Sequence, residues 1–185
     1  GVSLLDGGSI DNLDGASMQL LHALEQHPQS VFLLGLLTGT STDTYTRLST
    51  TAYLEWCERI GQEPVYEAYP AHDPCAGAVA ADRLLARPDR PDAVYGLFDP
   101  NGTDLLAAAR RYGLRVPDDL LLVCCSESTG YAATEPPITT LSLKPRRIGT
   151  AVVQLLIDAI EGVGPAHPVQ QVMPTELIIR TSSQR

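Results

Sequence analysis

The side chains of this chain that could do chemistry gather in four polar segments, each of which directly follows a short apolar run. The segments are residues 38–45, 69–73, 98–101 and 125–129. They carry hydroxyls, aromatic rings, a histidine and carboxylates, which suit hydrogen bonding to a small molecule and stacking on it. Because ligands of open parallel sheets bind at the carboxyl ends of the strands, we expect these segments to form one binding site.

Motifs for catalysis are absent from the sequence. The Ser/Thr-rich stretch at residues 38–44 lacks the Gly-x-x-x-x-Gly-Lys pattern of a phosphate-binding loop, and no Gly-x-Ser-x-Gly nucleophile elbow occurs. The four cysteines show no Cys-x-x-Cys spacing, so we expect free thiols in a reducing compartment rather than a zinc site. The sequence therefore predicts a binding protein without enzymatic activity, cofactor or metal.

The charge and hydropathy of the chain restrict its partners. The 185 residues carry a net charge of −9, which disfavours contact with the phosphates of nucleic acid. No apolar run reaches the length that spans a membrane, and the first residues do not resemble a signal peptide. We expect a cytoplasmic protein that does not contact a membrane.

Apolar runs that alternate with amphipathic stretches predict an α/β fold. Strands are expected at residues 2–5, 31–37, 64–68, 93–97, 120–124 and 177–180. Helices are expected at residues 14–27, 44–60, from residue 74 onward, 103–112 and 146–161. Helices of this length between strands act as crossovers, so we expect mainly parallel sheets with helices on both faces.

The helical periodicity also predicts which side chains face the core. The expected inner positions are Leu48, Ala52, Trp56, Ala76, Val79, Ala80, Leu84, Leu105, Leu106, Ala109, Tyr112, Ile148, Val152, Leu155, Leu156 and Ala159.

Several segments resemble, in order and spacing, one family of regulators. Residues 113–119 read GLRVPDD, residues 136–140 read PPITT, and residues 173–183 read MPTELIIRTSS. With IDNLDGA at residues 10–16, these segments resemble the effector-binding core of LacI/GalR-type transcriptional repressors. The resemblance covers most of the chain.

The resemblance implies a periplasmic-binding-protein-like fold of type I with two lobes. It assigns residues 1–30 and 141–164 to part of the first lobe, and residues 31–140 and 165–185 to a complete second lobe. The DNA-binding helix-turn-helix of the family is expected to lie outside this sequence, so that the chain would affect operator DNA only through that headpiece.

The function that the resemblance implies is that of an effector-binding and dimerisation domain. A small molecule bound between the lobes would shift the balance between two lobe arrangements and so change the affinity of a homodimer for DNA. The subunit contact is expected at residues 103–112 and 128–134. The alternative is a periplasmic sugar-binding protein of an ABC transporter, which the PPITT and PTEL segments make less favoured.

The resemblance places the effector against the loops that follow the strands. The candidate residues are Asp14, Thr44, Tyr45, Arg47, Ser49, Tyr69, His72, Phe98, Asp99, Ser126 and Glu127. Several have a plainer explanation as well, because Asp14 could cap a helix and Arg47 could be a solvated surface residue. Either Tyr69 or His72 could supply a ring that stacks on the ligand.

The sequence departs from the family pattern at two places in this site. Phe98-Asp99 stands where the family has Asn-Asp, and Ser126-Glu127 stands where it has Asp-Asp. A phenyl ring offers no hydrogen bond, and a serine holds hydroxyl groups more weakly than a carboxylate does. We therefore expect a sugar-like or modified effector that is less polar than a free hexose, or that carries an aromatic group or an anionic group for Arg47.

Overall fold

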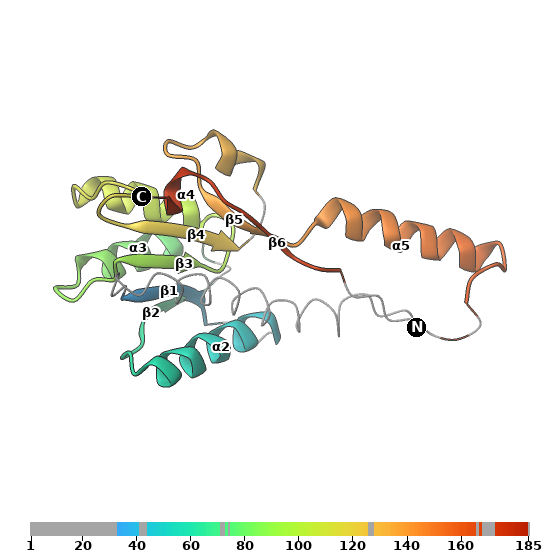
Figure 1. Cartoon of the computed structure of the whole chain (residues 1–185), viewed down its shortest axis with the longest axis horizontal. Helices are drawn as coiled ribbons and strands as arrows, with labels where there is room; N and C mark the ends of the chain where they lie inside the picture. Colours follow the sequence, from blue (N-terminus) through green and yellow to red (C-terminus); the bar gives the residue numbers. More distant parts are fainter. Residues whose placement is uncertain are drawn as a thin grey trace.

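The computed structural model describes residues 33–40, 44–70, 73, 75–125, 128–165, 167 and 173–184. Their strands form one sheet in the order β2-β1-β3-β4-β5-β6 (Figure 1). The strands that run parallel to one another are β1 (Leu34–Gly39), β2 (Val65–Tyr69), β3 (Ala93–Gly96), β4 (Leu121–Cys125) and β5 (Thr139–Ser142). Strand β6 (Glu176–Ile178) is antiparallel to β5. The prediction of a mainly parallel sheet is confirmed.

Helices α2 (Thr44–Ile60), α3 (Ala76–Ala86) and α4 (Asn101–Arg111) connect parallel strands and cover both faces of the sheet. Helix α5 (Pro145–Ile160) connects β5 to β6, and the short 3-10 turns are η1 (Thr129–Ala133) and η2 (Thr181–Ser183). Helices α3 and α4 pack on one face of the sheet and α2 packs on the other (Figure 1). The predicted α/β architecture with helices on both faces is therefore observed.

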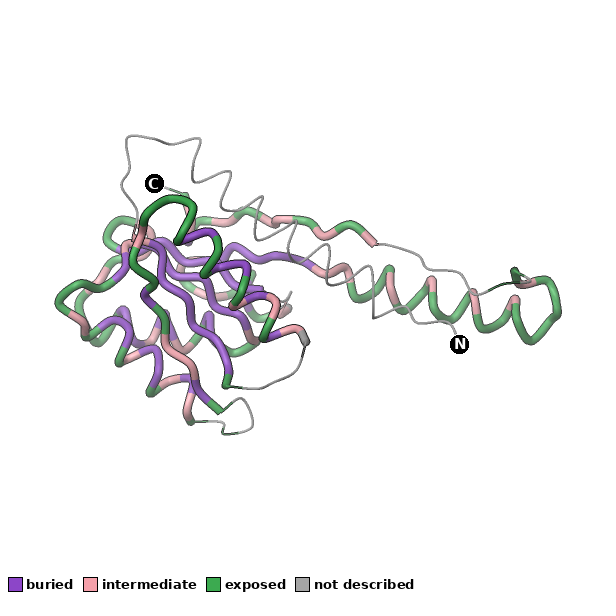
Figure 2. Tube along the Cα trace, turned by 90° about the horizontal axis from the view of Figure 1, so that it is seen from below, coloured by how far each residue is buried: buried purple, intermediate pink, exposed green. Residues whose placement is uncertain are grey.

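Strand β4 shows why its sequence reads as an uninterrupted apolar run. Leu121, Val123 and Cys125 belong to the core cluster under α2. Leu122 and Cys124 belong to the cluster under α3 and α4. All five side chains are buried, as the purple tube in Figure 2 shows for the centre of the sheet. A parallel strand covered on both faces has no solvent side, so no polar alternation is expected.

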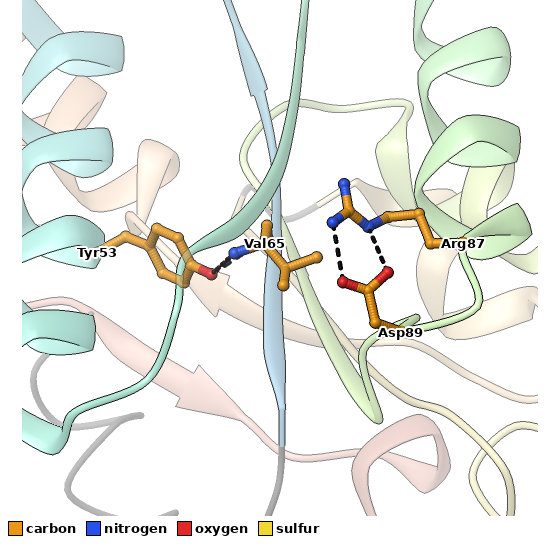
Figure 3. Close-up of polar contacts among 4 residues, drawn as sticks. All are labelled: Tyr53, Val65, Arg87 and Asp89. Carbon is orange, nitrogen blue, oxygen red and sulfur yellow. Dashed lines mark hydrogen bonds and ion pairs between the residues drawn. The ribbon is translucent and has the colours of Figure 1, made fainter.

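Helix α2 is fixed to the sheet by a buried tyrosine. The Tyr53 hydroxyl accepts a hydrogen bond from the Val65 N–H at 3.0 Å, which Figure 3 draws, and donates to the Leu34 carbonyl at 2.8 Å. The side chain is only 5 % exposed. Because these partners lie on β2 and β1, Tyr53 sets the position of α2 over this edge of the sheet, and with it the first turn of α2 at residues 44–47.

Glycines in the left-handed conformation follow three of the helices. Gly61, Gly113 and Gly162 have φ values of +70°, +68° and +72°, one residue after the end of α2 and two residues after the ends of α4 and α5. Glycine adopts this left-handed region without the steric cost that a Cβ atom brings. The strand and helix expected at residues 2–5 and 14–27 lie outside the described residues.

Two predicted core residues of α3 and α4 are exposed instead. Val79 is 47 % exposed, because the buried stripe of α3 consists of Ala80, Ala81, Leu84 and Leu85 instead. Tyr112 is 43 % exposed, because α4 ends at Arg111 and Tyr112 leaves the helical path as its C-cap.

Helix α5 also departs from the prediction that its apolar side chains face the core. Its sequence is strongly amphipathic, yet none of its residues is buried, and Leu156 is 59 % exposed. Figure 1 shows α5 extending away from the sheet, and Figure 2 shows its residues as exposed or intermediate. Periodicity identifies the apolar face of a helix, but it does not say what covers that face. The described helices include none that is both long and apolar enough to cross a lipid bilayer.

Candidate functional site

The strand register brings the predicted loops to one edge of the sheet. Gly39 at the end of β1 is opposite Tyr69 at the end of β2. Gly96 at the end of β3 is opposite Leu37 of β1 on one side and Cys124 of β4 on the other. Parallel strands with this register end together, so the segments after β1 to β4 emerge at a common carboxyl edge.

Three of the predicted site residues meet at this edge and form what we call the aromatic cluster, Tyr45, Tyr69 and Phe98. The ring centroids of Tyr45 and Phe98 are 6.2 Å apart, and those of Tyr69 and Phe98 are also 6.2 Å apart, with the second pair nearly edge to face. Such tilted geometries are favourable for aromatic pairs. Phe98 and Tyr45 are only half-buried, whereas Tyr69 is buried, so the first two rings retain surface for a ligand.

The Phe98 ring lies directly against the end of β1. A Cβ atom built on Gly39 would come within 2.8 Å of Phe98 Cε2. Gly39 is therefore required by this close approach, and a larger residue would displace the ring.

Tyr45 joins the first turn of α2 to the centre of the sheet. Its hydroxyl donates to the Leu97 carbonyl at 3.1 Å and lies 2.8 Å from Cys125 Sγ. These contacts fix the tyrosine between the ends of β3 and β4, which is where the sequence places the ligand-binding loops.

Asn101 organises the aromatic cluster, although it was not among the predicted site residues. Its side chain is completely buried. The Phe98 N–H donates to Asn101 Oδ1 at 2.9 Å, and Asn101 Nδ2 donates to the Tyr69 hydroxyl at 2.6 Å. One amide thus holds two members of the cluster. The sequence signal for this role was weak, since an asparagine at the start of a helix is common for local reasons.

Burial raises the pKa of two titratable groups near the cluster. Burial raises the pKa of Tyr69, although the hydrogen bond from Asn101 opposes that shift. Burial also raises the pKa of the Cys124 thiol, so this buried sulfur stays protonated near neutral pH and is a poor nucleophile. All four cysteines are free, as predicted. Among the described residues, no group of His, Cys, Asp or Glu side chains is arranged to hold a metal ion.

The remaining predicted residues are not all brought to the cluster. Arg47 is exposed, and because it follows Tyr45 by two positions it lies about 200° further around α2, away from the rings. Ser49 is buried, and its Oγ has no hydrogen-bond partner among the described residues. Asp99 is exposed beside Phe98.

Other predicted residues cannot be placed. Asp14, His72, Ser126 and Glu127 lie outside the described residues, and for Thr44 only the backbone at the start of α2 is described.

The chain is similar to transcriptional regulators in both sequence and fold. A family model described as "Periplasmic binding protein-like domain" matches residues 20–183. Over 179 residues the chain is 30% identical to the HTH-type transcriptional repressor CytR of Escherichia coli (strain K12), an alignment that covers 95% of this chain and 51% of that protein.

Solved structures of regulators have the same fold. A LacI family transcriptional regulator from Bifidobacterium animalis subsp. lactis matches with a TM-score of 0.79 at 26% identity, covering 92% of this chain and 61% of that one. The transcriptional regulator CelR, in its complex with cellobiose, matches with a TM-score of 0.71 at 26% identity, covering 95% of this chain and 52% of that one.

The extent of these matches identifies the family. The chain spans about half the length of CytR, and the aligned part covers nearly the whole of the chain. The fold of the chain matches that of the regulator from Bifidobacterium animalis subsp. lactis over 92% of the chain. The chain therefore belongs to the family of periplasmic binding protein-like domains, as part of the effector-binding core of a LacI/GalR-type regulator.

Proposed function

We propose that the chain acts as the effector-binding and dimerisation domain of a transcriptional repressor. A small molecule binds at the carboxyl edge of the sheet and shifts the balance between two arrangements of the lobes. That shift changes the affinity of the protein for operator DNA through a helix-turn-helix headpiece. The protein acts in the cytoplasm and catalyses no reaction.

The observation that carries this proposal is the aromatic cluster. Asn101 bonds to Phe98 and Tyr69 and the Tyr45 hydroxyl to Leu97, yet Phe98 and Tyr45 are only half-buried. Ring faces suit sugars, bases and other flat or weakly polar groups. CelR was solved with cellobiose, which supports a sugar-like effector for this chain as well.

The alternative of a periplasmic sugar-binding protein of an ABC transporter is not favoured. The relative that aligns with 95% of the chain is a repressor, and the matched structures are regulators.

We further propose the division of the chain into lobes. Residues 31–140 and 165–185 form the second lobe, and residues 1–30 with 141–164 belong to the first. Support comes from α5, on which Val153, Leu156 and Ile160 are exposed. An apolar face of this size is expected to be covered once a lobe is complete.

We also propose that the chain forms a homodimer through α4 and residues 128–134. Arg110 Nη2 donates to the carbonyl of Glu135, the residue that follows this loop, at 2.7 Å, so the bond ties α4 to the end of the loop. Tyr112 lies exposed at the end of α4. Sedimentation at micromolar concentration should detect a dimer that Tyr112→Asp weakens, and a wild-type chain that sediments only as a monomer would contradict the assignment.

A thermal-shift screen tests the effector site directly. At a ligand concentration of 100 times Kd, binding stabilises the folded state by about 2.7 kcal/mol. For a chain of this size that corresponds to an increase in Tm of about 5–10 °C. Disaccharides, nucleosides and nucleobases are the panel, and cellobiose is its first member.

The matched variants are Phe98→Ala, in the aromatic cluster, and Tyr66→Ala, which removes an aromatic ring that is 43 % exposed on β2. We expect Phe98→Ala to abolish the shift for any stabilising compound and Tyr66→Ala to retain it. A compound that stabilises all three proteins equally does not bind at the cluster and would contradict the proposal.

A further inference from the structure

A second feature of the carboxyl edge is a basic pocket, which we define by its charged lining residues Lys144, Arg146, Arg147, Arg180 and Glu176. The cavity has a volume of about 570 Å³, and its lining residues come from β5, the first turn of α5, β6 and η1 with their flanking residues. Cavities of roughly 300–1,000 Å³ are typical of small-molecule sites. Four basic residues and one acidic residue therefore line this cavity, in a chain whose net charge is −9.

Two of the four cations are held by the protein itself. Lys144 Nζ lies 3.2 Å from Glu176, and the lysine side chain is only 19 % exposed. Arg180 Nη1 donates to the Ile138 carbonyl at 2.6 Å and to Thr140 Oγ1 at 2.9 Å. These bonds fix the positions of the two cationic groups, and Glu176 neutralises only one positive charge.

The other two cations have no such partner within the described part of the chain. Arg146 and Arg147 are exposed in the first turn of α5, and neither forms an ion pair with a described residue. Their guanidinium groups lie at the amino end of a sixteen-residue helix, where the helix dipole also favours a negative charge. Like charges that converge on a cavity repel one another, and an anion in that cavity removes the repulsion.

The pocket lies on the same edge of the sheet as the aromatic cluster. Phe98 follows β3, whereas Ser128 and Lys144, which line the pocket, follow β4 and β5. Neighbouring strands are about 4.8 Å apart, so a ligand of moderate size could reach from one to the other.

We propose that the basic pocket binds an anionic oxygen group, a phosphate or a carboxylate, of a small molecule. The inference rests on the proposed function, because it assigns the charged end of the effector to the pocket and its less polar part to the aromatic cluster. Arginine forks form paired, charge-assisted hydrogen bonds with both groups. This assignment replaces Arg47, which the structure places away from the rings, as the partner of an anionic group.

Calorimetric titrations in buffer of low ionic strength test the inference with four probes. Glucose 6-phosphate and glucuronate carry the two anionic groups, glucose carries neither, and inorganic phosphate lacks the sugar. The test variant is Arg146→Gln/Arg147→Gln. The control is Arg83→Gln/Arg90→Gln, which removes the same charge from two exposed positions outside the pocket.

We expect at least one anionic sugar to bind and to lose affinity about tenfold or more in the test variant, since each charge-assisted hydrogen bond contributes at least that factor. The control should bind like wild type, and glucose should not distinguish the variants. A larger loss for glucose 6-phosphate than for glucuronate identifies a phosphate group, and the reverse identifies a carboxylate.

The inference would be overturned if the test variant and the control bound the anionic sugars equally well. It would also be overturned if neither anionic sugar bound. The proposed function fails separately. Suppose that a neutral compound binds, that Phe98→Ala abolishes its binding, and that the test variant binds the anionic probes as well as wild type does. The proposed effector site is then supported and the anion pocket is refuted. Suppose instead that the test variant loses affinity for an anionic probe, but that Phe98→Ala changes the affinity for no ligand. The anion pocket is then supported and the aromatic effector site is refuted.

Discussion

Replacing Asn101 by alanine should destabilise the protein more than any exposed change near the site. The substitution removes two hydrogen bonds from a fully buried side chain, the bond from the Phe98 N–H at 2.9 Å and the bond to the Tyr69 hydroxyl at 2.6 Å. Each intact bond has a net value of about 1 kcal/mol, and a buried group left without its partner costs about 1–3 kcal/mol. Because Phe98 is only half-buried, water can satisfy part of its N–H. We therefore expect a loss of about 2–4 kcal/mol.

Two further variants separate the contributions. Tyr69→Phe removes only one of the bonds and should cost about 1–2 kcal/mol. The double variant should cost about 1 kcal/mol less than the sum of the two single variants, because both remove the same bond. Thr103→Ala is the control, since its exposed hydroxyl bonds only to the Pro100 carbonyl and should contribute about 0.5 kcal/mol or less.

The assay is urea unfolding at pH 7, followed by the fluorescence of Trp56. This residue is the only tryptophan of the chain, and it is 5 % exposed in the folded state. Protein concentration must be held constant, because self-association would add to the apparent stability. An Asn101→Ala variant within about 0.5 kcal/mol of wild type would refute the role of Asn101 in holding the cluster.

Two further predictions concern stability. Tyr53→Phe should lower the free energy of unfolding by about 1–3 kcal/mol, because the buried Val65 N–H loses its acceptor. Arg87→Gln, which breaks the surface pair with Asp89 in Figure 3, should leave denaturant unfolding unchanged, and equal effects of the two variants would count against the argument from burial. The pH dependence of Asp104 is the second prediction. Burial raises the pKa of its carboxyl in the folded state from an ordinary value of 3.8, an effect that the charge of Arg111 opposes. The folded protein thus holds this proton more tightly than the unfolded chain does. As pH rises from the ordinary value through the folded pKa, the wild-type protein should lose stability relative to Asp104→Asn. Unfolding curves between about pH 3.5 and pH 7 measure this difference, and a gain in relative stability with rising pH would show that the carboxyl is stabilised in its charged form.

The sequence predicted the fold well because the relevant signals are local. Apolar runs and helical periodicity located β1 to β4, β6 and α2 to α5 close to their observed bounds, and both signals act within one element, whereas strand β5 was not predicted. The rule that parallel strands end at a common edge predicted that Tyr45, Tyr69 and Phe98 would lie near one another. The distances confirm that expectation.

What the sequence could not predict depends on contacts between distant segments. Asn101 and Tyr53 bond to groups 32 and 12 residues away, and nothing in their local sequence distinguishes a buried amide or hydroxyl from an exposed one. The apolar stripe of α5 was correctly recognised as apolar but wrongly expected to be inside. The covering of a helix face is decided by the rest of the fold rather than by the helix itself.

The most direct test of the central claim is to map where a stabilising compound binds, by measuring backbone amide shifts of the ¹⁵N-labelled chain during titration. If the effector binds at the carboxyl edge, the largest shifts will occur at Thr40, Tyr45, Tyr69 and Phe98. The amides of Leu33 and Asp92, which precede β1 and β3 at the opposite edge, will stay unchanged. The assignment of the chain as an effector-binding domain with its site at the aromatic cluster would be contradicted if the largest amide shifts occurred at this opposite edge. Amide shifts spread evenly over the surface would contradict it as well.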